Sequence, residues 1–153
     1  SLWYGMKQKA KIIVSAPCCH KEVRRYLDSH VPKAGDHPYL DVLRHNIYKE
    51  RIAETVTDSM RALLLEIDDY DVQVFEFIGG EHTSKNVMIT AVKRARERTK
   101  SQKETLRQRM RSLAELHGVQ KQKLADLMGE SMQDVTENLE VEKVNRRRGM
   151  PSL

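Results

Sequence analysis

The sequence predicts an α/β fold made of a parallel strand, a crossover helix and an antiparallel closing hairpin, followed by a helical basic tail. Three patterns predict it. A β-branched run at 12–14 ends before Pro17, apolar residues recur at helical spacing over 39–67, and two strand-like segments at 71–78 and 87–92 flank a short polar loop. A helical crossover would make the first two strands parallel, and a short loop would return the third antiparallel.

Size and composition favour one core-bearing unit. The chain has 153 residues, enough for one core but not for two of ordinary size. No run approaches the roughly 18 apolar residues of a membrane span, and Ser1–Ala10 lacks the apolar core of a signal peptide. Because the two cysteines are adjacent, we expect no intrachain disulfide, and we expect a reducing, cytoplasmic setting without membrane contact.

The first strand is predicted at Lys11–Ala16. Its unbroken run of Ile and Val is typical of a strand that is buried on both faces. Leu2–Lys9 before it and 20–27 after it are predicted to be helical. The Pro- and Gly-containing segment 28–38 is either a lid over a site or a plain connection.

The second element is predicted as one long helix, Tyr39–Ile67. Leu, Ile, Val and Met recur there at three- and four-residue steps, as on the buried face of an amphipathic helix. Charged residues, among them Asp58 and Arg61, are expected on the opposite, solvent-exposed faces. Asp68-Asp69-Tyr70 is predicted to end the helix.

Two polar clusters are expected to meet at one edge of the sheet. Pro17, Cys18, Cys19 and His20 follow the first strand, and the loop 81–86 joins the next two. In the predicted topology both clusters emerge at the same edge, where open α/β sheets bind ligands. The candidate residues of the loop are Glu81, His82, Thr83, Lys85 and Asn86.

Three interpretations of Cys18, Cys19 and His20 are open. Thiolates and imidazoles bind zinc, with His30, His37 or His82 as further ligands, although three consecutive ligands fold poorly around one ion. A cysteine at a helix start has a stabilised thiolate and can act as a nucleophile. The remaining reading is that the thiols simply pack beside the strand. We expect no metal.

The positive charge is concentrated in the tail. Residues 1–92 contain 12 Lys and Arg against 13 Asp and Glu, and residues 93–153 contain 15 against 9, so the tail accounts for the net charge of +5. Such a segment suggests a polyanionic partner, RNA or DNA, although a solvated basic helix face explains the charge equally well. The candidate nucleic-acid contacts are Lys93, Arg94, Arg96, Arg98, Arg107, Arg109 and Arg111.

The tail, 94–153, is predicted to be helical. Lys93–His117 reads as a polar helix with a thin apolar stripe, ended by Gly118. Lys121–Met128 reads as a second helix, ended by Gly129. A capping box of Ser131 with Asp134 opens a third.

Residues 121–140 also have the spacing of a helix-turn-helix. Its small, turn and packing positions would be Ala125, Gly129 and Val135, but Glu130 stands where such turns carry an apolar residue. The segment is therefore either a DNA-reading unit or a simple helical appendage.

Four separated segments resemble a family of S-adenosylmethionine-dependent methyltransferases that includes tRNA 2′-O-methyltransferases and methyltransferase-like proteins. They are Ile-Ile-Val-Ser-Ala-Pro-Cys-Cys-His-Lys-Glu (12–22), Leu-Arg-His-Asn-Ile-Tyr-Lys-Glu-Arg (43–51), Thr-Asp-Ser-Met-Arg-Ala-Leu-Leu-Leu (57–65) and Glu-Phe-Ile-Gly-Gly-Glu-His-Thr-Ser-Lys-Asn (76–86). The resemblance covers roughly residues 1–93 and implies the later half of a Rossmann-like, class I methyltransferase sheet.

By this resemblance, Pro17–His20 and 81–86 line the substrate side of a cleft, with His20 and His82 as tentative catalytic bases. The resemblance also implies S-adenosylmethionine as the cofactor. The family's glycine-rich cofactor loop and ribose-binding acidic residue precede the matching segment and are not found in this sequence, so the segment alone is expected to be inactive.

Two hypotheses follow. The first is the C-terminal portion of an RNA methyltransferase, and the second is a non-catalytic module that binds nucleic acid through its basic tail. In either case a buried-type strand without an inner neighbour would leave an open sheet edge. We therefore expect self-association through that edge or through the 39–67 helix.

Overall fold

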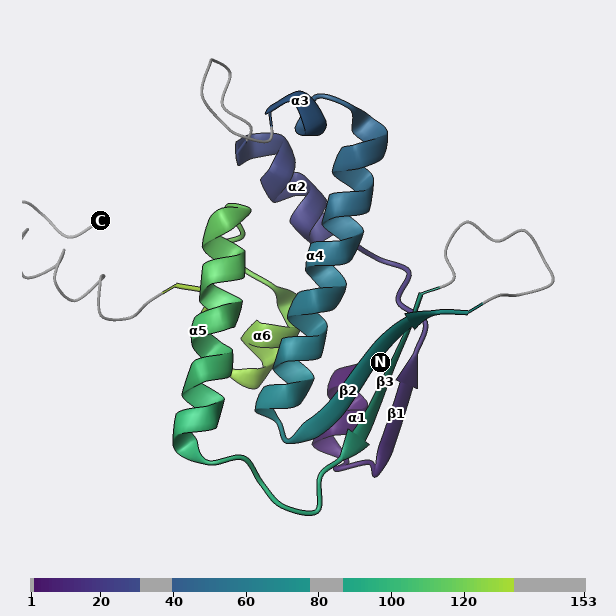
Figure 1. Ribbon diagram of the computed structural model, residues 1–153, viewed down its shortest axis with the longest axis vertical. Coiled ribbons are helices and arrows are strands. Elements are labelled where there is room, and N and C mark those ends of the chain that lie inside the picture. Colours follow the sequence, from purple (N-terminus) through teal and green to yellow (C-terminus); the bar gives the residue numbers. More distant parts are fainter. Residues whose placement is uncertain (1, 31–39, 78–86, 134–153) are drawn as a thin grey trace, which may run out of the picture.

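The computed structural model describes residues 2–30, 40–77 and 87–133, which form a mixed α/β structure (Figure 1). Three antiparallel strands pack against helices. In chain order the elements of these ranges are α1 (Leu2–Lys7), β1 (Ile12–Ser15), α2 (Lys21–His30), α3 (Leu40–Leu43), α4 (Asn46–Ile67), β2 (Tyr70–Glu76), β3 (Val87–Lys93), α5 (Lys100–Leu116) and α6 (Lys123–Met128).

The strands lie in the order β1-β3-β2, and both pairings are antiparallel. The hairpin predicted from 71–78 and 87–92 is present, with Val72 and Ile13 both opposite Ala91 on β3. β1 and β2 do not pair with each other. Because each is antiparallel to β3, they run in the same direction on either side of it.

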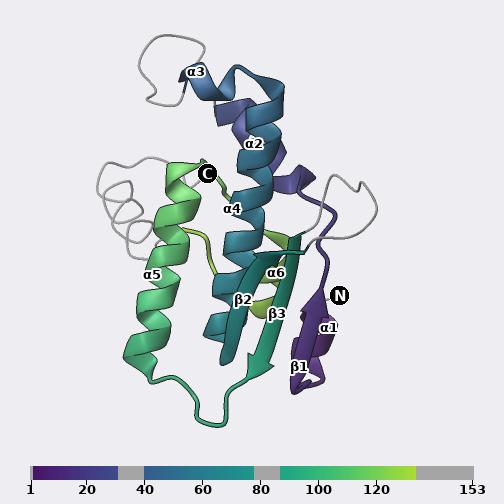
Figure 2. The same cartoon turned by 45° about the vertical axis from the view of Figure 1, so that its right-hand side comes forward.

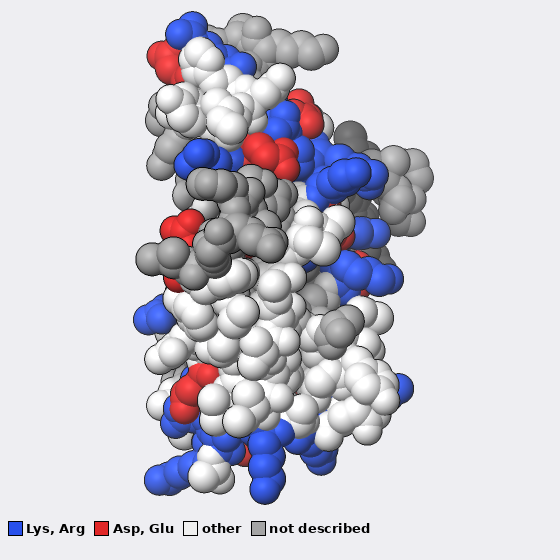
Figure 3. Space-filling model, turned by 90° about the vertical axis from the view of Figure 1, so that its right-hand side faces the viewer, with Lys and Arg blue, Asp and Glu red and all other residues white. Residues whose placement is uncertain are grey.

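The expectation that the first strand is buried on both faces is wrong. Ile13 is buried, but Ile12 is 64% and Val14 59% exposed. Their neighbours on the same face are exposed too, with Val92 at 51% and Phe75 at 42%. The inner face packs on helices, whereas no described element covers the outer face, which forms an uncharged surface in Figure 3.

The predicted helix Tyr39–Ile67 is interrupted. α3 ends at Leu43 and α4 begins at Asn46, because His45 is extended, with φ −93° and ψ 118°, and serves as the N-cap of α4. His and Asn have low helix propensity, which favours a break in the helix here. The apolar periodicity nevertheless continues across this break.

α4 is the central helix. It lies between the sheet and α5, with α2 and α6 against it, as Figures 1 and 2 both show. α1 covers the inner side of β1, where a Cβ at Gly5 would lie 3.0 Å from the Ile13 side chain. Glycine therefore permits the close approach of α1 to β1.

The predicted helix Lys93–His117 begins later than expected. Lys93 is the last residue of β3, and the helix starts at Lys100 behind a capping box in which Thr99 and Gln102 bond each other's backbone N–H. Gly118 and Gly129 both have positive φ, 65° and 73°, and end α5 and α6 as predicted.

The first helices of the tail share the core of the preceding segment. One cluster of buried side chains joins α4 and the sheet to the tail residues Leu106, Met110, Ala114, Val119, Leu124, Ala125 and Met132. The proposed division into 1–93 and 94–153 thus runs through a continuous core. The predicted third helix, Asp134 included, and most of loop 28–38 lie outside the described residues. None of the helices in the described ranges combines the length and apolarity needed to cross a bilayer.

Candidate functional site

The sheet brings the two predicted clusters to one edge as far as the described residues extend. Ser15, the last residue of β1, lies opposite Ile89 near the start of β3, and Val87 lies opposite Glu76 at the end of β2. The turn Pro17–His20 therefore lies at the end of the sheet where β2 ends and β3 begins. The hairpin candidates lie outside the described residues: Glu81, His82, Thr83, Lys85 and Asn86.

His20 is buried and tied to the central helix. Its Nε2 lies 3.1 Å from Oδ2 of Asp58, and both side chains are under 8% exposed. The other carboxylate oxygen accepts a 2.7 Å hydrogen bond from Arg61, which also donates to the backbone carbonyl of Cys19 at 2.7 Å. We call this set, His20, Asp58, Arg61 and the Cys19 carbonyl, the turn latch.

The turn latch holds the β1–α2 turn against α4. Since the His20 ring is buried, it contacts α4 rather than the open rim, and its Nδ1 has no hydrogen-bond partner among the described residues. A base must reach the proton that it removes. In this arrangement His20 is a positioning residue for the turn.

The helical pattern predicted solvent-exposed positions for Asp58 and Arg61, and for Asp58 this prediction is wrong. Asp58 is 5% exposed. It stands seven residues before Leu65, which is fully buried, so both lie on one side of α4. That heptad spacing, with a basic residue three positions on, was the signal that could have revealed a buried ion pair.

Cys18 and Cys19 are free thiols, and both are exposed. In the described part of the chain, no three His, Cys, Asp or Glu side chains gather closely enough to hold a metal ion. What the turn presents to a ligand is therefore two accessible thiols on a braced backbone.

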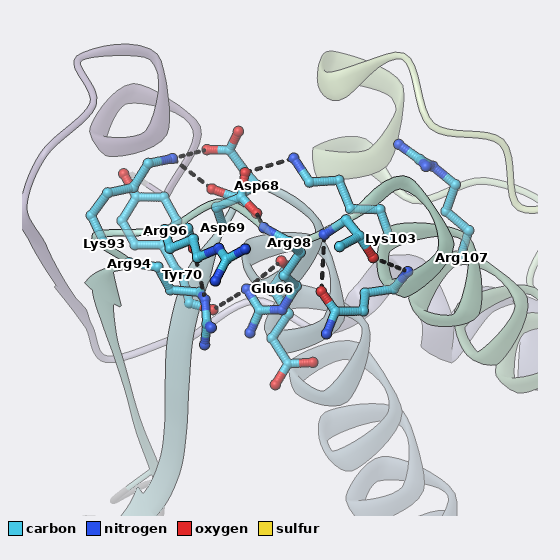
Figure 4. Close-up of polar contacts among 12 residues, drawn as sticks. Glu66, Asp68, Asp69, Tyr70, Lys93, Arg94, Arg96, Arg98, Lys103 and Arg107 are labelled. Carbon is cyan, nitrogen blue, oxygen red and sulfur yellow. Dashed lines mark hydrogen bonds and ion pairs between the residues drawn. The ribbon is translucent and has the colours of Figure 1, made fainter.

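Most of the basic residues proposed to contact nucleic acid are paired within the molecule, many at the opposite end of the sheet (Figure 4). Lys93 reaches Asp68 at 3.4 Å, and Arg94 and Arg98 reach Asp71 at 2.6 and 3.3 Å. Arg111 contacts Glu104 at 3.1 Å. Arg96 and Arg109 are exposed and have no ion pair with a described residue.

Glu130, the departure from the helix-turn-helix pattern, has a structural role. Its two oxygens accept hydrogen bonds of 2.7 and 2.8 Å from Arg107 of α5. A bidentate pair of this kind fixes orientation as well as distance. It binds the turn after α6 to α5, so the acidic residue serves the packing of the tail.

Asp69 anchors the start of the tail. It is buried, has a left-handed φ of 61°, and accepts hydrogen bonds from Lys103 Nζ at 2.6 Å and the Arg98 backbone N–H at 2.7 Å. Burial by itself raises the pKa of the Asp69 carboxyl, but these two donors and the nearby lysine charges together lower it below its ordinary value.

We predict that Asp69→Asn reduces the acid sensitivity of folding. Because the pKa of Asp69 is lowered on folding, its ionised form stabilises the native state above the unfolded pKa of about 3.9, and that contribution is lost as pH falls through the folded value. The variant should lose about 1–2 kcal/mol at pH 7 and differ less from wild type at pH 3. Urea unfolding at both pH values measures this. Asp28, whose pKa the Lys49 hydrogen bond lowers, titrates in both proteins and so cancels in the comparison. If the variant and wild type differ in unfolding free energy by the same amount at pH 7 and pH 3, the prediction is contradicted.

A cleft of ≈ 580 Å³ lies at this same end, between α1, α5 and α6. Trp3, Lys7 and Lys9 line one side, and Lys103, Arg107 and Met128 line the other. Four carboxylates share the lining: Asp68, Asp69, Glu97 and Glu130.

The cleft is not lined by Pro17–His20, the turn that the resemblance places on the substrate side. The cleft with mixed charge lies at the sheet end opposite the Pro17–His20 turn, and the thiols of that turn are on open surface. A nucleotide cofactor needs a concave pocket that covers most of its surface. The exposed thiols of the turn are not enclosed in this way.

Comparison of the chain with protein-family models, with curated proteins and with solved structures gives no match. The family resemblance therefore remains a prediction from the sequence motifs.

Proposed function

We propose that this chain is the C-terminal portion of an S-adenosylmethionine-dependent methyltransferase that acts on RNA, and that its β1–α2 turn forms part of the substrate-side wall. The observation that carries the proposal is an exposed edge strand beside a bare apolar face of the sheet. β1 is an edge strand of the described sheet, and the outer face beside it exposes Ile12, Val14 and Val92.

An exposed edge next to an exposed apolar face is what a partial sheet would leave. Sheets with helical crossovers are usually covered on both faces, and unprotected edges invite pairing. β1 and β2 run in the same direction, are connected through α2–α4, and enclose an antiparallel β3. This agrees with the closing part of a Rossmann-like sheet whose earlier strands and helices would cover both surfaces.

The role proposed for the turn is to shape the wall beside the methyl acceptor. In the turn latch, Arg61 of α4 donates a hydrogen bond to the Cys19 carbonyl. The Cys18 and Cys19 side chains are exposed. The methyl donor would be held by another part of the protein. These residues would position the acceptor, and proton removal would fall to a group outside the turn.

Cofactor binding tests this proposal. We expect S-adenosylmethionine to leave the melting temperature of this chain unchanged and to raise that of a chain extended before Ser1. Saturation at 100 times the Kd would stabilise the longer chain by about 2.7 kcal/mol. Adenosine triphosphate at the same concentration is the control ligand. Failure of the longer chain to respond would sink the methyltransferase proposal, and a response of this chain alone would relocate the cofactor site.

The alternative is a non-catalytic nucleic-acid-binding module. The exposed cations Lys9, Lys11 and Arg96 favour it, since they need no cofactor to bind a polyanion. RNA binding by both chains, with no cofactor response from either, is the result that would select this alternative.

A further inference from the structure

The cations near the N-terminal end of β1 divide into two groups. One group is neutralised by carboxylates: Lys93, Arg94, Arg98 and Lys103 pair with Asp68, Asp69 and Asp71. The other group is exposed and has no carboxylate within ion-pair distance among the described residues. Its members, which we call the basic end, are Lys7, Lys9, Lys11, Arg96 and Lys100.

Lys7, Lys9, Lys11 and Arg96 come from separate segments that the fold brings together, and Lys100 is the first residue of α5. Lys11 and Lys93 are joined by a 2.8 Å backbone hydrogen bond where β1 begins and β3 ends. Lys7 and Lys9 line the cleft together with Lys93 and Lys103. Arg96 lies beside Lys93 and Arg94 in Figure 4, and Figure 3 shows Lys and Arg side chains gathered below the uncharged face of the sheet.

The paired group gives the basic end a fixed frame. Arg98 donates to the carbonyls of Glu66 and Tyr70, at 2.8 and 3.1 Å, and its own N–H reaches Asp69. The loop that carries Arg96 is therefore bonded to the end of α4. Glu97 is the exposed carboxylate in that loop, so a surplus of positive charge remains at the surface.

We propose that the basic end is a binding surface for the phosphate backbone of single-stranded RNA. Lysine and arginine side chains that are exposed and unpaired release condensed counterions from a nucleic acid at no cost in broken ion pairs. The paired tail residues would first have to break their ion pairs with carboxylates. The surface thus differs from the tail helix that the sequence suggests, since three of its five cations precede residue 12.

An exposed aromatic residue favours a single strand. Tyr4 is 66% exposed on α1, three residues before Lys7, and side chains at that spacing are neighbours on a helix. Unpaired bases stack on aromatic rings beside a basic groove. A membrane surface also presents phosphates, but it has no unpaired bases to stack on Tyr4.

The inference shares its partner with the proposed function but does not depend on methyl transfer. Binding of RNA is measured without any cofactor, so loss of cofactor response would leave it standing. Conversely, loss of RNA binding at the basic end would leave a cofactor response of the longer chain intact.

The test is salt-dependent binding of a fluorescent single-stranded RNA of about 15 nucleotides to the whole chain. With five phosphate contacts we expect a slope of log K against log salt near −3.5, which weakens binding about 100-fold between 50 and 200 mM salt. Replacing all five cations of the basic end by Gln should bring the slope close to zero. Tyr4→Ala should weaken binding about tenfold without changing the slope.

A charge-matched control replaces five exposed cations on other surfaces by Gln: Lys21, Arg25, Arg51, Lys121 and Lys123. It should keep almost the whole wild-type slope, since these five cations make no phosphate contact in the proposed complex. Equal loss in both variants would overturn the proposal, because only net charge would matter. Binding to anionic phosphatidylglycerol vesicles but not to RNA would overturn it too. All ten side chains are exposed, and an unchanged melting temperature confirms that the variants fold.

Discussion

Cutting the chain after Lys93 is expected to abolish cooperative folding, even though the sequence divides naturally there. The truncated chain would lack four large apolar side chains that α5, α6 and their connection bury in the shared core: Leu106, Met110, Val119 and Leu124. At about 1.5–3 kcal/mol for each buried side chain, the loss is roughly 6–12 kcal/mol. That is comparable to the whole stability of an ordinary domain, about 5–15 kcal/mol.

Circular dichroism during thermal unfolding would measure the effect, and two point variants calibrate it. Met110 is fully buried, and Met110→Ala should cost about 2–5 kcal/mol. Leu116 is 58% exposed, and Leu116→Ala should stay within about 0.5 kcal/mol of wild type. A sharp unfolding transition for residues 1–93, within a few degrees of the full chain, would show that the first segment is an independent domain.

Asp58→Ala is expected to lower the free energy of unfolding by about 3–5 kcal/mol, since it removes one partner of a buried ion pair. His20 Nε2 would lose its acceptor, and Arg61 would keep only its hydrogen bond to the Cys19 carbonyl. The turn that bears the two thiols would then be released from α4. Urea unfolding measures the stability, and the reaction rate of Cys18 and Cys19 with a thiol reagent measures the release.

The chain provides a matched control in Asp41 and Arg44, an ion pair with the same i,i+3 spacing. The Asp41 side chain is 88% exposed, and its distance to Arg44 is 3.6 Å. Asp41→Ala should leave stability almost unchanged, since exposed pairs contribute little. Asp58→Asn, which keeps one acceptor oxygen, should fall between wild type and Asp58→Ala. Equal effects of Asp41→Ala and Asp58→Ala would mean that the turn latch does not stabilise the fold.

The local patterns of the sequence predicted the elements well where short-range chemistry decides them. Alternating apolar residues gave the hairpin of 71–78 and 87–92, and glycines at 118 and 129 ended helices because each adopts positive φ. Thr99 was not recognised as a helix start, although its capping partner Gln102 stands three residues later. The junction at His45 was also missed, since apolar periodicity continues across it.

The candidate site was predicted less completely. The sequence predicted that Pro17–His20 and the hairpin loop lie at the same end of the sheet. The register of Ser15 with Ile89 agrees with this for the described residues. It could not reveal that His20 is directed into the core by Asp58, because the two residues are 38 positions apart. The loop residues from Glu81 to Asn86 stay predictions.

The sequence by itself determined the α/β class, the order of the elements, the antiparallel hairpin and the overall basic charge. Each of these depends on neighbouring residues or on composition. Only the tertiary structure decided which charges are available, because ion pairs such as Lys103 with Asp69 join residues far apart in the chain. It also decided that the outer face of β1 is bare, since burial depends on what packs there and not on how apolar Ile12 and Val14 are.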